Sequence, residues 1–115
     1  GYSLGGLFAL WASFHTDAFS RVISASGSLW YPGFVEYARA HSFSSALSCV
    51  YLSLGKKEHR TPNRLLRNVQ ANTQDILELC RNRGVLARLD MNPGNHFQDV
   101  QERTAKGIAW ALRQG

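Results

Sequence analysis

Sulfur and negative charge are scarce in this sequence. Its 115 residues include two cysteines and one methionine, and 8 acidic residues stand against 13 lysines and arginines. Cys49 and Cys80 lie far apart, in a strand-like and a helix-like run, without metal-ligand spacing, so we expect buried reduced thiols and no metal site. No apolar run approaches the roughly 20 residues of a membrane span. We therefore expect no membrane partner and a cytoplasmic location.

Five of the basic residues gather in one stretch of the chain: Lys56, Lys57, Arg60, Arg64 and Arg67. Such a cluster can serve an anionic ligand or a nucleic acid. Here it straddles a predicted loop and the first turns of a predicted helix, where a solvated basic face is common. We interpret it as surface charge and expect no nucleic-acid partner. A hydrophobic content of 44% with 18% charged residues is ordinary for a folded domain.

The first six residues, Gly1-Tyr2-Ser3-Leu4-Gly5-Gly6, contain the pattern G-x-S-x-G. This is the strand-to-helix turn that exposes a nucleophilic serine in α/β-hydrolases. A side chain at position 1 or 5 would be expected to collide with the neighbouring strand or helix. Residues 4–14 are apolar at helical spacing, which predicts a buried helix directly after Ser3. Because no strand precedes the turn here, we interpret residues 1–115 as the C-terminal portion of one α/β domain.

Apolar runs and turn residues predict strands and helices in strict alternation. The predicted strands cover residues 21–26, 49–54 and 85–91, and the predicted helices cover residues 3–15, 34–40, 62–83 and 98–112. Pro62 near the start and Gly84 just past the end mark the limits of the long helix. This order predicts an α/β fold, with parallel strands covered by helices on both faces. Functional residues are then expected just beyond the carboxyl ends of the strands.

A serine nucleophile needs a histidine base and a carboxylate, which occur along α/β-hydrolase chains in the order serine, acid, histidine. Of the four histidines only His96 follows the last predicted strand, and Glu58 directly follows the second. For Glu58 the alternative is a surface ion pair with Lys57 or Arg60, which would contribute little.

Two other arrangements of the acid remain open. Asp90 also lies between Ser3 and His96 in the chain, but it falls inside a predicted strand. Ser3 and His96 could also act as a two-residue unit with a looser acid.

Two further features bear on substrate binding. The backbone N–H of Leu4, the residue after the candidate nucleophile, is the expected oxyanion donor, and a second donor is expected from an earlier loop. Trp30 and Tyr31 follow the first predicted strand. They could line the acyl or alcohol pocket, or they could be core aromatics.

Three segments together resemble the putative-esterase family of α/β-hydrolases: residues 1–6, residues 52–58 (Leu-Ser-Leu-Gly-Lys-Lys-Glu) and residues 92–97 (Asn-Pro-Gly-Asn-His-Phe). That family includes enterochelin (ferric siderophore) esterase-like enzymes, S-formylglutathione hydrolase (esterase D) and the mycolyltransferases. The similarity is greatest to the bacterial siderophore-esterase-like members. It implies Ser3 as nucleophile, Glu58 as triad acid and His96 as base.

The resemblance implies a serine carboxylic-ester hydrolase acting on a small-molecule ester, siderophore-like or other, without a cofactor or metal. Acyl transfer to a hydroxyl by the same triad is one alternative. A catalytically inactive, truncated hydrolase module is the other.

Overall fold

Three parallel strands form the sheet in the computed structural model, which describes residues 1–114. They are β1 (Arg21–Ala25), β2 (Cys49–Gly55) and β3 (Leu86–Asn92), and their spatial order is β1-β2-β3. β2 lies at the centre and is buried along its whole length. The predicted parallel α/β sheet is therefore confirmed.

The first residues of the chain extend this sheet past β1. Tyr2 forms a parallel bridge with Ala25. The N–H of Ala25 donates to the carbonyl of Gly1 at 2.9 Å, and the N–H of Ser3 donates to the carbonyl of Ala25 at 3.0 Å. Ser3 thus stands at the end of a strand-like segment, where the sequence pattern placed it.

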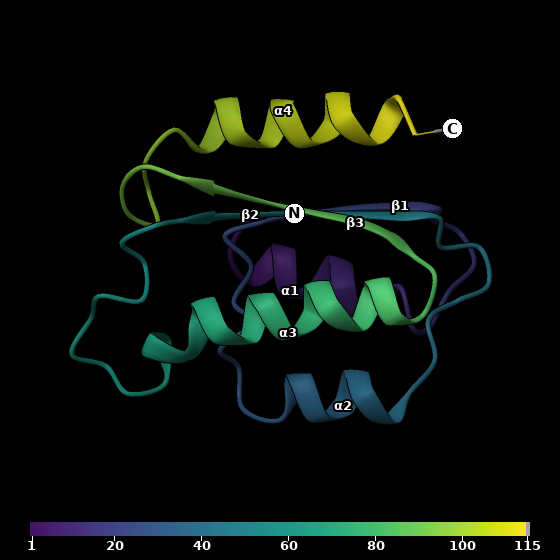
Figure 1. The fold of residues 1–115 in the computed structure, drawn as a ribbon, viewed down its shortest axis with the longest axis horizontal. Helices are drawn as coiled ribbons and strands as arrows, with labels where there is room; N and C mark the ends of the chain where they lie inside the picture. The colour runs from purple at the N-terminus through teal and green to yellow at the C-terminus, as the bar shows by residue number, and fades with distance from the viewer. Residues whose placement is uncertain (115) are drawn as a thin grey trace.

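Helices cover both faces of the sheet, as expected (Figure 1). They are α1 (Leu4–Ala12), α2 (Phe34–Ala40), α3 (Val69–Asn82) and α4 (Val100–Leu112). α4 lies alone on one face, whereas α1 and α3 lie on the other, and α2 packs outside α3 (Figure 1). Each crossover between the parallel strands contains a helix, which is the connection that such strands require.

Alternation along β2 supplies both faces of the core. Val50 and Leu52 belong to the larger apolar cluster, together with Leu10 of α1 and Ile76 of α3. Tyr51 belongs to a smaller cluster, whose members also include Cys49 of β2 and Trp110 of α4. Gly107 allows α4 to approach closely, because a Cβ there would lie 2.6 Å from the Tyr51 ring.

The predicted long helix is shorter than expected and begins at Val69, not at Pro62. A short 3₁₀ turn over Leu66–Asn68 precedes it. The side-chain oxygen of Asn63 accepts hydrogen bonds from the N–H groups of Leu65 and Leu66. Asn63 therefore holds a local turn in place of a first helical turn, a common competition for asparagine. Leu65, which precedes this 3₁₀ turn, is 46% exposed.

The last helix also begins late, at Val100 instead of Gln98. The side-chain oxygen of Asn95 accepts from the N–H of Phe97. Asp99 then adopts the left-handed conformation with a φ of 54°. This irregular stretch positions the loop that carries His96.

Cys49 and Cys80 are free and buried. Burial raises the pKa of the Cys80 thiol to about 12, which makes it unreactive. All five residues of the basic cluster are exposed. Over residues 1–114, no helix is both long enough and apolar enough to cross a bilayer.

Candidate active site

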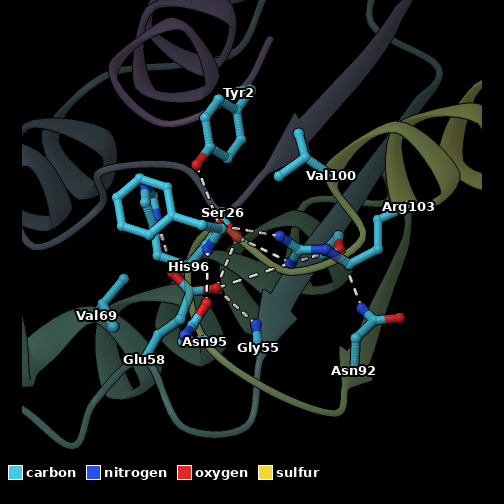
Figure 2. A network of polar contacts seen from close by, with 12 residues as sticks. Tyr2, Ser26, Gly55, Glu58, Val69, Asn92, Asn95, His96, Val100 and Arg103 are labelled. Atoms are coloured by element: carbon cyan, nitrogen blue, oxygen red, sulfur yellow. Dashed lines mark hydrogen bonds and ion pairs between the residues drawn. The ribbon is translucent and has the colours of Figure 1, made fainter.

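Four polar side chains meet where four neighbouring strand segments end, and Figure 2 shows three of them, Ser26, Glu58 and His96. Ser3 follows the N-terminal segment, Ser26 follows β1, Glu58 follows β2 and His96 follows β3. The loops after β2 and β3 are joined by backbone hydrogen bonds, including one of 2.9 Å from the N–H of Lys57 to the carbonyl of Gly94. The fold therefore brings distant parts of the sequence to one edge of the sheet.

Ser3 occupies a strained backbone conformation, with a φ of 60° and a ψ of −123°. Non-glycine residues adopt such angles only where the surrounding structure enforces them. Here the carbonyl of Ser3 accepts from the N–H groups of Gly6, Leu7 and Ser28 at 3.0–3.2 Å. The turn thus presents the Ser3 hydroxyl at the start of α1.

The expectation about the glycines of this turn is correct at one position and wrong at the other. A Cβ on Gly1 would lie 2.2 Å from the carbonyl oxygen of Gly5, so glycine is required there. A Cβ on Gly5 would meet nothing within 4 Å, because Gly5 is exposed. The close approach is at Gly6 instead, where a Cβ would lie 2.7 Å from Ser24 Oγ and 2.9 Å from Gly27 Cα.

Ser3, His96 and Glu58 form a continuous hydrogen-bonded chain. Ser3 Oγ lies 3.0 Å from His96 Nε2. On the other side of the imidazole, His96 Nδ1 lies 2.7 Å from Glu58 Oε1. With a proton on Nδ1, the ring donates to the carboxylate and leaves Nε2 free to accept from the serine hydroxyl.

Glu58 is held by several donors at once. Its side chain is 4% exposed, and Oε2 accepts from Ser26 Oγ and from the N–H of Gly55, both at 2.6 Å. Burial alone would raise the pKa of Glu58. Hydrogen bonds from His96, Ser26 and Gly55 outweigh the burial and lower this pKa below its usual value. Glu58 is therefore an ionised acceptor at neutral pH.

The alternatives for the acid are placed elsewhere. Neither Lys57 nor Arg60 pairs with Glu58, whose ion-pair and hydrogen-bond contacts among the described residues include His96 and Arg103. Asp90 lies within β3 and points to the α4 side, where it accepts from Tyr51 and Arg88. It also pairs with Lys106.

His96 is fixed through its backbone as well as its ring. The Tyr2 hydroxyl donates to the His96 carbonyl at 3.1 Å, and the Tyr2 and His96 rings stack with centroids 5.0 Å apart. Arg103 Nη2 donates to the same carbonyl at 3.2 Å. Figure 2 shows Tyr2 and Arg103 reaching the loop from different elements.

Sequence reasoning missed Tyr2, Ser26 and Arg103 as parts of this site. For Arg103 a signal exists, because it shares a helical face with Gly107, Trp110 and Ala111, all of them buried. An arginine in phase with a buried stripe needs a polar partner inside the protein. Ser26 was placed inside the predicted strand 21–26, but β1 ends at Ala25, so the strand-end rule points to Ser26 once the strand is shortened by one residue. For Tyr2 the sequence carries no comparable signal.

The expected binding residues lie in two neighbouring hollows. Trp30 lines a cavity of about 230 Å³ together with Ser3, Glu58 and His96. Tyr31 is half exposed and lines a separate apolar groove of about 490 Å³, which also includes Leu4. The N–H of Leu4 opens α1 and has no intrahelical acceptor. Within residues 1–114, no group of three or more His, Cys, Asp or Glu side chains is placed to bind a metal.

Comparison with solved structures identifies the class of fold. The siderophore hydrolase EstA from Aspergillus nidulans is 25% identical with a TM-score of 0.76, over 96% of this chain and 45% of EstA. The enterobactin esterase FES from Shigella flexneri, crystallised in the presence of enterobactin, is 26% identical with a TM-score of 0.72, over 97% of this chain and 28% of FES. The chain has the α/β fold of these hydrolase-fold esterases.

Its structural neighbours are siderophore and enterobactin esterases, in agreement with the family that the sequence motifs resemble. No family model matches the chain. In sequence it is 28% identical over 85 residues to the uncharacterized protein YbbA of Bacillus subtilis, across 73% of this chain and 34% of YbbA. The chain thus spans less than half the length of each of these proteins.

Proposed function

We propose that this protein is a serine carboxylic-ester hydrolase in which Ser3 is the nucleophile, His96 the general base and Glu58 the triad acid. The observation that carries the proposal is the hydrogen-bonded chain from Ser3 Oγ through the His96 imidazole to Glu58, with separations of 3.0 and 2.7 Å. This is the geometry in which a histidine takes a serine proton while a carboxylate fixes its tautomer. The likeness to esterase structures supports it.

The reaction proceeds in two halves. Ser3 Oγ attacks the ester carbonyl carbon while His96 Nε2 takes the hydroxyl proton, and the resulting oxyanion accepts from the N–H of Leu4. When this intermediate collapses, the alcohol leaves with the proton from His96. Water then attacks the acyl-serine with His96 again as base, which releases the carboxylic acid and restores Ser3. Glu58 remains ionised and stabilises the imidazolium in both halves.

The proposed substrate is a small ester of the siderophore class. The cavity beside Ser3 is small, and Trp30 supplies an aromatic wall for the acyl or alcohol group. Tyr31 is proposed to contact the part of the substrate that extends into the neighbouring apolar groove. The siderophore hydrolase EstA and the enterobactin esterase FES support this substrate class.

Ser3→Ala tests the proposal in the purified protein. Turnover of p-nitrophenyl butyrate is expected to fall by about 10⁶-fold, because loss of the nucleophile alone removes nearly all the contribution of a triad. A fluorophosphonate probe is expected to label Ser3 of the wild type and to fail with His96→Ala. Ser28→Ala is the matched control, since Ser28 lines the same cavity and is expected to keep the labelling. Undiminished turnover by folded Ser3→Ala would contradict the mechanism.

A further inference from the structure

Arg103 is a buried cation with no assigned role in the reaction proposed above. It lies in the first turns of α4, its side chain is 3% exposed, and it extends toward the loops after β1, β2 and β3. Figure 2 shows its guanidinium directed at Ser26 and the Glu58 carboxylate. A charge buried this deeply is costly unless the surroundings compensate it.

The guanidinium contacts both the acid and the base of the triad by separate nitrogen atoms. Nη1 donates to Ser26 Oγ at 2.9 Å and lies 3.7 Å from Glu58 Oε2. The Ser26 hydroxyl donates a hydrogen bond to the same Oε2 at 2.6 Å. Nη2 donates to the carbonyl of His96 at 3.2 Å. One rigid planar group therefore fixes the position of the carboxylate and of the histidine backbone.

Stability alone does not explain this placement. Arg103 Nε is buried without a hydrogen-bond partner among the described residues, and an unpaired buried donor is destabilising. A buried ion pair is commonly no more stabilising than apolar residues of the same volume. The arrangement does, however, hold two reacting groups in fixed relative geometry, which is what triad chemistry requires.

We propose that Arg103 is a positioning residue, which sets the relative geometry of Glu58 and His96 and supplies the positive charge that balances the carboxylate. This inference rests on the proposed triad function. Arg103 does not touch the reacting atoms, and it acts through Ser26, Glu58 and the His96 carbonyl. A lysine in its place would keep the charge and lose the planar fork that reaches these separate acceptors.

Other charged and titratable groups also face the Glu58–His96 pair. Tyr2 reaches it from the N-terminal segment, and burial followed by the charge of Glu58 raises the pKa of the Tyr2 phenol, so that this group stays neutral. Lys57 and His59 flank Glu58 in its loop. Arg103 is the cation that approaches from α4.

Three variants of the purified protein test this role. Arg103→Met removes both the charge and the guanidinium group, Arg103→Lys keeps the charge without the guanidinium, and Lys106→Met removes a different charge from α4. Lys106 is the matched control because it lies on α4, carries the same charge and pairs with Asp90 outside the triad. Arg103→Met is expected to lower kcat by about 10²-fold with KM nearly unchanged, the cost of a misplacement of about 1 Å. It is also expected to move the acidic limb of kcat/KM to higher pH, since loss of a nearby cation favours the protonated forms.

Arg103→Lys is expected to leave the acidic limb in place and to recover part of the lost kcat. Lys106→Met is expected to match the wild type in kcat, KM and pH profile. If folded Arg103→Met behaves as Lys106→Met does, or loses rate without any shift of the limb, the proposal is wrong. If Arg103→Met does not fold, Ser26→Ala decides: it is expected to lower kcat at unchanged KM, and a wild-type kcat would overturn the proposal.

A readout without substrate separates this proposal from the proposed function. ¹⁵N NMR of the imidazole reports which nitrogen of His96 carries the proton. The wild type is expected to hold the proton on Nδ1, and Arg103→Met is expected to populate both tautomers. If the wild type hydrolyses no ester and takes no fluorophosphonate label, the proposed function fails. A tautomer distribution unchanged in Arg103→Met would refute the positioning role in either case.

Discussion

Near the carboxyl ends of the strands, the two faces of the sheet carry different kinds of side chain, apolar on one face and polar on the other. On the face covered by α1 and α3, β2 contributes Val50 and Leu52 to a continuous apolar cluster. On the α4 face Tyr51 and Trp110 make apolar contacts, and closer to the strand ends Ser53 lies among polar side chains. Asn92 and Arg103 both donate to the hydroxyl of Ser53, at 3.0 and 3.4 Å.

This difference indicates that one face of the sheet contributes mainly to folding stability and the other to the arrangement of the candidate site. The α1 and α3 face buries large aliphatic side chains, which is the main source of folding free energy. The α4 face accommodates a buried charge and hydroxyl groups that connect to Glu58, at some cost in stability. Neighbouring residues of β2 therefore belong to separate systems, since successive side chains of a strand point to opposite faces.

Leu52→Ala and Ser53→Ala test whether the two faces of the sheet contribute separately to stability and to turnover. Leu52 is 1% exposed in the central strand, and its truncation is expected to lower the free energy of unfolding by about 2–5 kcal/mol. The rate constant per folded molecule is expected to change little. Urea unfolding together with ester hydrolysis, measured under conditions where the variant is folded, checks both quantities.

Ser53→Ala is expected to show the reverse pattern. Its free energy of unfolding is expected to fall by about 1 kcal/mol, because Asn92 and Arg103 each lose one acceptor. Turnover is expected to fall about tenfold, through a displacement smaller than the 1 Å that costs about 10²-fold. If Leu52→Ala impairs turnover as much as Ser53→Ala does, the two faces are not separate systems.

The apolar half of this comparison could be predicted from the sequence, and the polar half only in part. Apolar runs, helical spacing and turn residues predicted every α-helix and strand of the described residues, because buried apolar side chains dictate these patterns. The long helix was misplaced, since Asn63 forms a local turn that competes with helix. The strand-end rule led to Glu58 and His96. It missed Ser26 because the predicted strand 21–26 ran one residue past the end of β1. It says nothing of Arg103, whose role depends on contacts between segments far apart in the chain.

Glu58→Gln tests the electrostatic part of the polar face. The hydrogen bonds that lower the pKa of Glu58 stabilise the folded protein above the pKa of this group in the unfolded chain, about 4.3. This stabilisation is lost as the pH falls through the lower folded-state pKa. At pH 7 the variant is therefore expected to be less stable than the wild type by about 1.5–3 kcal/mol, the contribution of a hydrogen bond to a charged group.

The difference in stability between Glu58→Gln and the wild type is expected to shrink as the pH falls through the acid range. Urea unfolding at a series of pH values measures it. Glu78→Gln, an exposed position on α3, is the control and is expected to show no such convergence. A constant difference from neutral to acid pH would show that Glu58 contributes through packing and not through its charge.

Gly5→Ala and Gly6→Ala probe the turn between the N-terminal segment and α1, and the smallest effect on stability is expected at Gly5. Gly6 faces Ser24 and Gly27, and a Cβ there would lie 2.9 Å from the Gly27 Cα, which is backbone and cannot rotate away. Gly6→Ala is therefore expected to lower the free energy of unfolding by about 1–3 kcal/mol. Gly5 opens onto free space within α1, so Gly5→Ala is expected to gain about 0.5–1 kcal/mol from helix propensity.

The opposite signs distinguish two explanations of the G-x-S-x-G pattern. If the pattern recorded collisions at both of its glycines, Gly5→Ala would destabilise the protein as Gly6→Ala does. Equilibrium urea unfolding of the two variants decides between them. A stabilised Gly5→Ala protein would show that the steric requirement of this turn lies at Gly1 and Gly6. The position of the Ser3 hydroxyl would then be determined by the close approach of α1 to β1, where Gly6 contacts Ser24.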